Sequence, residues 1–141
     1  MKGFYPYQPQ NAFPHMGPED TKVWKRFIQM YPEAYDTVDY DVKVGTVPAF
    51  VTRDEQAIGG NIKDLYLRKI DVVAFAGDHI DVIEVKPIAG FSAIGQILGY
   101  MMHWSEEHGN VAQARAVIVC ASAPLDVHLL AEQNGVEIIT V

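Results

Sequence analysis

The fold is decided by residues 70–86, which read IDVVAFAGDHIDVIEVK. Two runs rich in β-branched residues flank Gly77-Asp78, a pair that favours a two-residue hairpin turn. With that turn Ala76 faces His79, and every further pair follows by counting back along both runs. The stretch therefore predicts two antiparallel strands with a defined register.

This register brings two acidic residues together. Asp71 falls opposite Glu84, and Lys69 falls opposite Lys86. Because opposed residues and residues two apart share a face, we expect all four on one face of the hairpin. Two carboxylates so close repel each other, and they tend to share a proton, a lysine or a divalent cation. A salt-bridge ladder on a solvated face is the alternative; the apolar residues along the same face disfavour it because they need a cover.

Oxygen ligands of this kind suit magnesium, which keeps several waters and takes only one or two protein carboxylates. The backbone carbonyl of Val85 is a candidate third ligand. Lys86 lies two residues beyond Glu84, so it is expected to point at the same spot, where it would contact a phosphate or a metal-bound water.

The pattern along the chain predicts an α/β protein with the element order αβββαβαβ. A first helix begins at Gly17-Pro18, because proline favours the first helical position. Ser92 is the expected N-cap of a second long helix that ends before Gly109, and Gly95 and Gly99 are expected to pack closely on a sheet. We expect helices over 18–31, 92–107 and 124–133, and strands over 38–44, 116–120 and 136–141 besides the two of the hairpin. Strand–helix–strand crossovers give a mixed sheet with helices on its faces.

Length and composition set the broad class. The chain has 141 residues, which suits one domain, and we divide it into an irregular arm over 1–17 and a single domain over 18–141. A net charge of −7 excludes a generally basic nucleic-acid coat. The single cysteine, Cys120, excludes a disulfide framework and any multi-cysteine metal site. No apolar run is long enough to span a membrane, and the first residues lack the apolar stretch of a signal peptide, so we expect a cytoplasmic protein.

The basic residues are unevenly distributed. Of the 11 lysines and arginines, 10 precede residue 87. Lys63, Arg68 and Lys69 lie just before Asp71, and they are the candidate phosphate-binding residues of an otherwise acidic chain.

Asp71 followed by Glu84-Val85-Lys86 resembles the signature of the PD-(D/E)xK nuclease superfamily. Gln96 and Tyr100 are similar to the Gln-x-x-x-Tyr motif of its RecB-like branch. The resemblance covers roughly residues 18–121 and implies a restriction endonuclease-like αβββαβ core, to which this chain adds a C-terminal helix and strand. It implies a magnesium- or manganese-dependent nuclease acting on DNA, with Asp71 and Glu84 as metal ligands and Lys86, Gln96 and Tyr100 completing the catalytic set.

The chain departs from the family pattern in two places, and it is also acidic where many nucleases are basic. Ile70 stands where the family often has a proline. The family often has a glutamate on its first helix, where this chain offers Glu19 and Asp20, which also suit the helix dipole. One alternative is an inactive binding or assembly module with the same fold; a homodimeric, structure-selective resolvase is another. Whether the enzyme is an endo- or exonuclease stays open.

Overall fold

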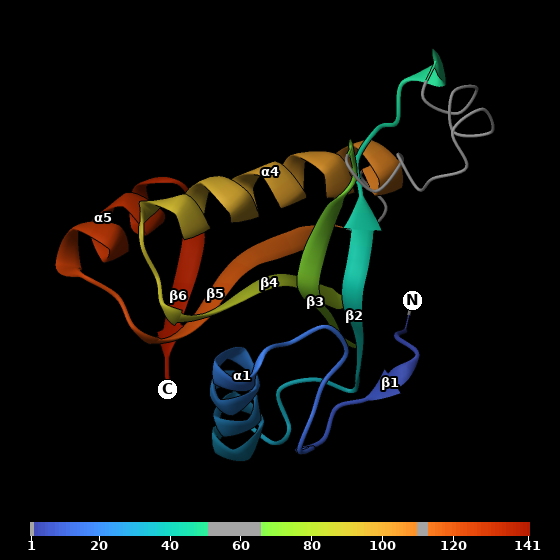
Figure 1. Cartoon of the computed structure of the whole chain (residues 1–141). Coiled ribbons are helices and arrows are strands. Elements are labelled where there is room, and N and C mark those ends of the chain that lie inside the picture. The colour runs from blue at the N-terminus through green and yellow to red at the C-terminus, as the bar shows by residue number, and fades with distance from the viewer. Residues whose placement is uncertain (1, 51–65, 110–112) are drawn as a thin grey trace.

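The computed structural model describes residues 2–50, 66–109 and 113–141, and these form one mixed sheet with helices on both faces (Figure 1). The strands lie in sequence order and the helices cover them. The strands are β1 (Tyr5–Pro6), β2 (Thr37–Val44), β3 (Arg68–Ala76), β4 (His79–Ile88), β5 (Ala114–Ser122) and β6 (Val136–Thr140); the helices are α1 (Pro18–Met30), α4 (Phe91–His108) and α5 (Leu125–Gln133).

The sheet is antiparallel in its first part and parallel in its second. Strands β1 to β4 pair antiparallel, whereas β4, β5 and β6 pair parallel. The two parallel steps need crossovers, and α4 and α5 supply them on one face while α1 covers the other (Figure 1). The predicted mixed α/β architecture is confirmed.

Each face of the sheet buries its own apolar core. Helix α1 presents Trp24, Phe27 and Ile28 to one face, as their helical spacing predicts, and all three are buried. Helix α4 presents Ile97 and Trp104 to the other face. The sheet is therefore covered on both sides, which leaves room for a polar site only where strands part or helices begin. No helix among the described residues is long and apolar enough to cross a bilayer.

The hairpin of β3 and β4 has the predicted register. Ala76 pairs with His79, and the ladder runs back to Val72 and Ile83. Gly77 has a φ of +58°, a left-handed conformation that glycine adopts without strain, and its N–H donates to Asp36 Oδ2 at 3.0 Å. The turn chemistry thus fixes the pairing on which the candidate site depends.

Two predictions about α4 are wrong. The helix begins at Phe91 with the extended residue Gly90 as N-cap and no side-chain cap, so Ser92 lies inside the first turn. A Cβ built on Gly95 or Gly99 would meet nothing within 4 Å, so these glycines do not pack closely on the sheet. Both face open space instead. Lys63 and most of the unassigned stretch over 45–62 lie outside the described residues.

The N-terminal arm includes a two-residue strand, β1, that pairs with the edge of β2, and Phe13 is buried against Tyr40. Gly3 comes so close to β2 that an added Cβ would lie 2.3 Å from the carbonyl oxygen of Val38. Its N–H donates to Thr37 Oγ1 at 2.8 Å. Only glycine fits this approach.

We therefore expect Gly3→Ala to displace the start of the arm and to lower the free energy of unfolding by about 1–2 kcal/mol. Urea denaturation measures the loss. Gly99→Ala is the matched control, because a Cβ there meets nothing within 4 Å and alanine is favoured over glycine inside a helix. Equal stability of the wild type and Gly3→Ala would contradict the packing described.

Candidate active site

The alternation of β3 breaks at Asp71. Ile70 and Val73 both pack in the core under α4, although they are three residues apart, whereas Val72 packs in the core under α1. The neighbouring strand is irregular at the same level, where Asp41 has a φ of +53°. Asp71 therefore sits at the point where the strand changes face, and the expected strict sharing of one face by Lys69 and Asp71 is wrong.

The break turns the Asp71 carboxylate toward β4. Asp71 Oδ2 accepts a hydrogen bond from the backbone N–H of Val85 at 2.8 Å. The backbone ladder between β3 and β4 ends at Val72 and Ile83, so the expected backbone pairs Asp71–Glu84 and Lys69–Lys86 do not form. A side chain takes the place of the strand's own hydrogen bond here, and the two strands part around an acid.

The second acid, Glu84, is buried beside Asp71. It is only 3% exposed, and its Oε2 atom has no hydrogen-bond partner among the described residues. Lys86 Nζ lies 3.6 Å from the other carboxylate oxygen, Oε1. An unpartnered buried carboxylate oxygen costs free energy, so this group is poorly suited to a purely structural role.

Burial and, next, the negative charge of Asp71 raise the pKa of Glu84 to about 8. Burial also raises the pKa of Asp71, against the hydrogen bond from Val85. Tyr100 contacts the Glu84 carboxyl, and burial together with that acid raises the pKa of its hydroxyl. Tyr100 thus stays protonated and can act as a hydrogen-bond donor to the acid pair.

Asp20 reaches the same region from the first turn of α1. Burial raises its pKa, while Lys86 opposes the rise, and Asp20 in turn raises the pKa of Asp71. As an acid in the first turn of α1, Asp20 also suits the helix dipole. The structure adds an electrostatic interaction of Asp20 with Lys86 and Asp71, which are far from it in the sequence.

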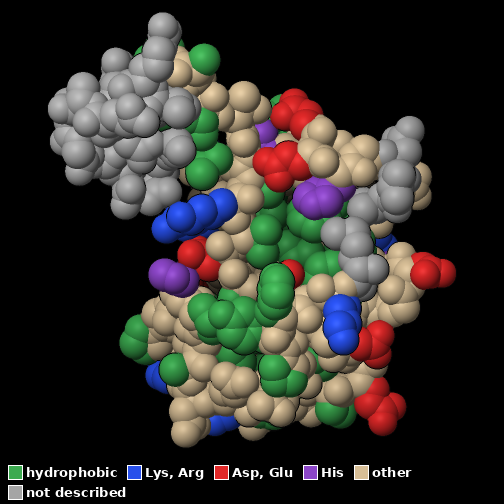
Figure 2. Space-filling model, turned by 90° about the vertical axis from the view of Figure 1, so that its right-hand side faces the viewer, with side chains coloured by type: hydrophobic (Ala, Val, Ile, Leu, Met, Phe, Trp, Pro, Cys, Tyr) green, Lys and Arg blue, Asp and Glu red, His purple; other side chains and the backbone are tan. Residues whose placement is uncertain are grey.

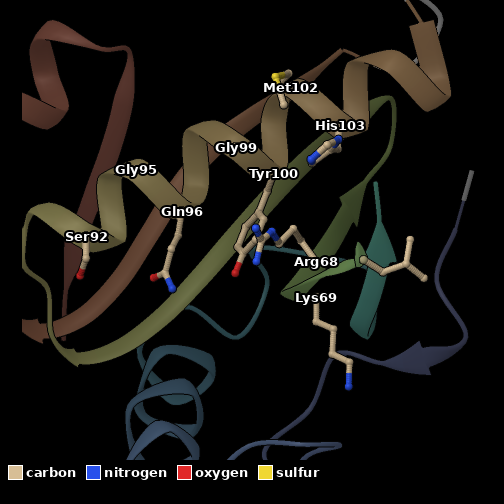
Figure 3. A pocket seen from close by; sticks show the side chains of 10 residues that line it. Arg68, Lys69, Ser92, Gly95, Gln96, Gly99, Tyr100, Met102 and His103 are labelled. Carbon is tan, nitrogen blue, oxygen red and sulfur yellow. The ribbon is translucent and has the colours of Figure 1, made fainter. Parts of the chain in front are cut away.

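A hollow of about 830 Å³ opens next to the acid pair, between α4 and the start of β3. Gln96, Tyr100 and Arg68 line it and point into the same space, whereas Lys69 also lines it but extends away from α4 (Figure 3). The structure thus brings the predicted Gln96 and Tyr100 together with Arg68. On the face shown in Figure 2, acidic, basic and histidine side chains are interspersed. Contacts with phosphate on this face would therefore be made by individual basic side chains.

The residues present suit a hard divalent cation. Among the described residues no three histidine, cysteine, aspartate or glutamate side chains stand close enough to hold a metal. Asp71 and Glu84 form a two-carboxylate set, the number that magnesium takes while it keeps its waters. The unpartnered Oε2 of Glu84 is the atom that such an ion would satisfy. The carbonyl of Val85 stays a predicted ligand.

A second buried acid, Asp81, lies away from this site, as the alternation along β4 predicts. Tyr35 donates a hydrogen bond to it, and Arg115 donates two, at 2.9 and 3.0 Å. His79 Nε2 is 3.0 Å from Asp81 Oδ1. Asp81 is 1% exposed, and its contacts with Tyr35 and Arg115 join it to parts of the chain outside β4, so we interpret it as a structural counterpart to Glu84.

Two solved structures resemble the fold of this chain. A repair endonuclease from Pyrococcus abyssi matches with a TM-score of 0.56 and 19% identity, over 92% of this chain and 49% of that one. The EndoMS–dsDNA2 complex matches with a TM-score of 0.52 and 17% identity, over 92% of this chain and 48% of that one. The fold is that of these endonucleases.

The predicted restriction endonuclease-like core is thereby confirmed. The chain spans about half the length of both structures. No protein-family profile and no curated protein matches the chain, so membership of the RecB-like branch stays a prediction.

Proposed function

We propose that this protein is a metal-dependent nuclease that hydrolyses phosphodiester bonds of DNA. The observation that carries the proposal is the buried pair of Asp71 and Glu84 beside Lys86, with one Glu84 oxygen that has no hydrogen-bond partner in the part of the chain that the structure describes. The nuclease-type fold supports it, because the pair lies on the hairpin of that fold. DNA as the substrate is supported by the neighbours, of which one is a repair endonuclease and the other a complex with double-stranded DNA.

In this proposal Asp71 and Glu84 bind magnesium or manganese. When bound, the ion stabilises negative charge on the phosphate and lowers the pKa of its water. Lys86, whose Nζ atom lies 3.6 Å from Glu84 Oε1, holds the attacking water or a phosphate oxygen in place. Tyr100 orients the Glu84 carboxylate through its hydroxyl.

The remaining residues bind the substrate. Arg68 and Lys69 line the hollow and neutralise phosphate charge, together with Lys63, which lies outside the described residues. The Gln96 side chain extends from α4 into the same space (Figure 3). Because such contacts displace counterions from DNA, binding is expected to weaken as the salt concentration rises.

Manganese is expected to stabilise the folded protein. A ligand that binds only the folded form adds about 2.7 kcal/mol at 100 times its dissociation constant, which in a chain of this size raises Tm by roughly 10 °C. Thermal denaturation with and without millimolar manganese measures it. Glu84→Gln is the matched variant, because it keeps the size of the side chain and removes the charge, and it should lose the shift.

The manganese effect should also depend on pH. A carboxyl whose pKa is raised on folding, here from 4.5 to about 8, adds stability below its unfolded pKa and loses it as the pH rises through 8. The metal binds the ionised form. The metal-free protein should therefore lose stability toward pH 8 while the gain from manganese grows. A wild type with no shift at any pH would favour the alternative, an inactive binding module.

A further inference from the structure

The wall of the hollow that α4 forms has two positions without a side chain. Gly95 and Gly99 stand one turn apart on α4, and a Cβ at either position would point into open space. Glycine inside a helix lowers stability relative to alanine. Neither glycine has a positive φ, so the backbone does not require it. The packing of this chain thus gives no reason for two glycines here.

Beside the glycines runs a stripe of hydrogen-bonding side chains. Ser92, Gln96, Tyr100 and His103 follow one another at helical spacing, line the hollow, and point to the same side of α4 (Figure 3). Side chains of these kinds are common partners of phosphate oxygens. Arg68 supplies a positive charge across the hollow.

The hollow has the length of a strand segment rather than of one nucleotide. From Ser92 to His103 the helix rises about 16 Å. One strand of B-form DNA carries a phosphate about every 3.4 Å along the helix axis. Because the strand winds as it rises, its phosphates are spaced more widely along the backbone, so this length suits a few successive phosphates. At the inner side of the hollow, Tyr100 contacts Glu84, whose buried Oε2 atom has no hydrogen-bond partner among the described residues. The stripe thus reaches the acid pair through Tyr100.

We infer that α4 is the track along which the sugar–phosphate backbone of the cleaved strand lies, with Gly95 and Gly99 giving the clearance that lets this backbone reach Asp71 and Glu84. The inference rests on the proposed nuclease function. It makes the two glycines substrate-binding positions, because any side chain there would occupy the path of the strand.

Gly95→Leu and Gly99→Leu test the track. Both variants should fold with a Tm no lower than that of the wild type, because leucine favours a helix more than glycine does. Their affinity for a labelled DNA duplex, measured by fluorescence anisotropy in EDTA, should fall about tenfold or more through lost phosphate contacts, with a salt slope smaller by about 0.9 per lost contact. Ser105→Leu is the matched control, because Ser105 is exposed on α4 away from the hollow.

The outcomes separate the track from the function. If the wild type cleaves DNA and both leucine variants bind within twofold of it, the track is wrong and the nuclease proposal stands. If the wild type cleaves and the variants lose binding while Ser105→Leu keeps it, both stand. If the wild type neither binds nor cleaves DNA, both are wrong.

Discussion

Glu84→Gln is expected to reduce metal-dependent DNA cleavage by about a thousandfold or more, a loss similar to that from removing a group that stabilises transition-state charge. The substitution keeps the shape of the buried side chain but removes the negative charge that would hold the ion beside Asp71. Lys86→Ala should cost about a hundredfold or more, because Lys86 is the cation 3.6 Å from Glu84 Oε1. Initial rates on plasmid and on linear duplex measure both losses.

Asp126→Asn is the matched control for charge, because Asp126 is an exposed acid on α5 and should leave the rate unchanged. A closed plasmid that becomes nicked would identify endonuclease activity, and loss only of linear ends would identify an exonuclease. Equal residual rates in the wild type, Glu84→Gln and Lys86→Ala would trace the activity to a contaminant and count against the proposed site.

The two buried acids of β4 should respond to neutralisation with opposite signs in the metal-free protein. Asp81→Asn removes the charge that Arg115 and Tyr35 bind. Hydrogen bonds to a charged group contribute about 1.5–3 kcal/mol, so Tm should fall by roughly 5–10 °C. Glu84→Gln removes the repulsion with Asp71 and the cost of burying an unpartnered charged oxygen, so its Tm should rise by a few degrees, about 3 °C or more.

Thermal denaturation in EDTA at pH 8 measures both changes side by side. The paired outcome matters more than either value, because both acids are almost fully buried on the same strand. A fall in Tm for Glu84→Gln as large as that for Asp81→Asn would mean that Glu84 is a structural acid like Asp81.

Local sequence chemistry predicted the elements and the hairpin register well. Gly77-Asp78 defines a tight turn, and the pairing from Ala76–His79 to Val72–Ile83 follows from it without further information. The hairpin register was thus sufficient to predict that Asp71 and Glu84 lie close together. The predicted site residues themselves await the experiments above.

The detailed geometry could not be predicted from the same patterns. Strand alternation assumes a regular pleat, but the pleat breaks at Asp71, opposite Asp41 with its positive φ. A left-handed aspartate gives no clear signal in a sequence. The break is what turns the Asp71 carboxylate toward the N–H of Val85.

Interactions between elements far apart in the sequence could not be predicted from local patterns either. Asp20 reads as a helix-dipole acid until the fold sets α1 against the end of the hairpin, where Lys86 influences its pKa. Gly95 and Gly99 read as packing positions, because glycine in a helix usually signals either a close approach or an open space, and only the fold tells which.

The most direct test of the account is the anomalous density of crystals grown with manganese. The account predicts a peak bound by carboxylate oxygens of Asp71 and Glu84, including the Glu84 oxygen that lacks a partner, and no such peak in crystals of Glu84→Gln. Wild-type crystals at millimolar manganese with no peak between these two acids would contradict it.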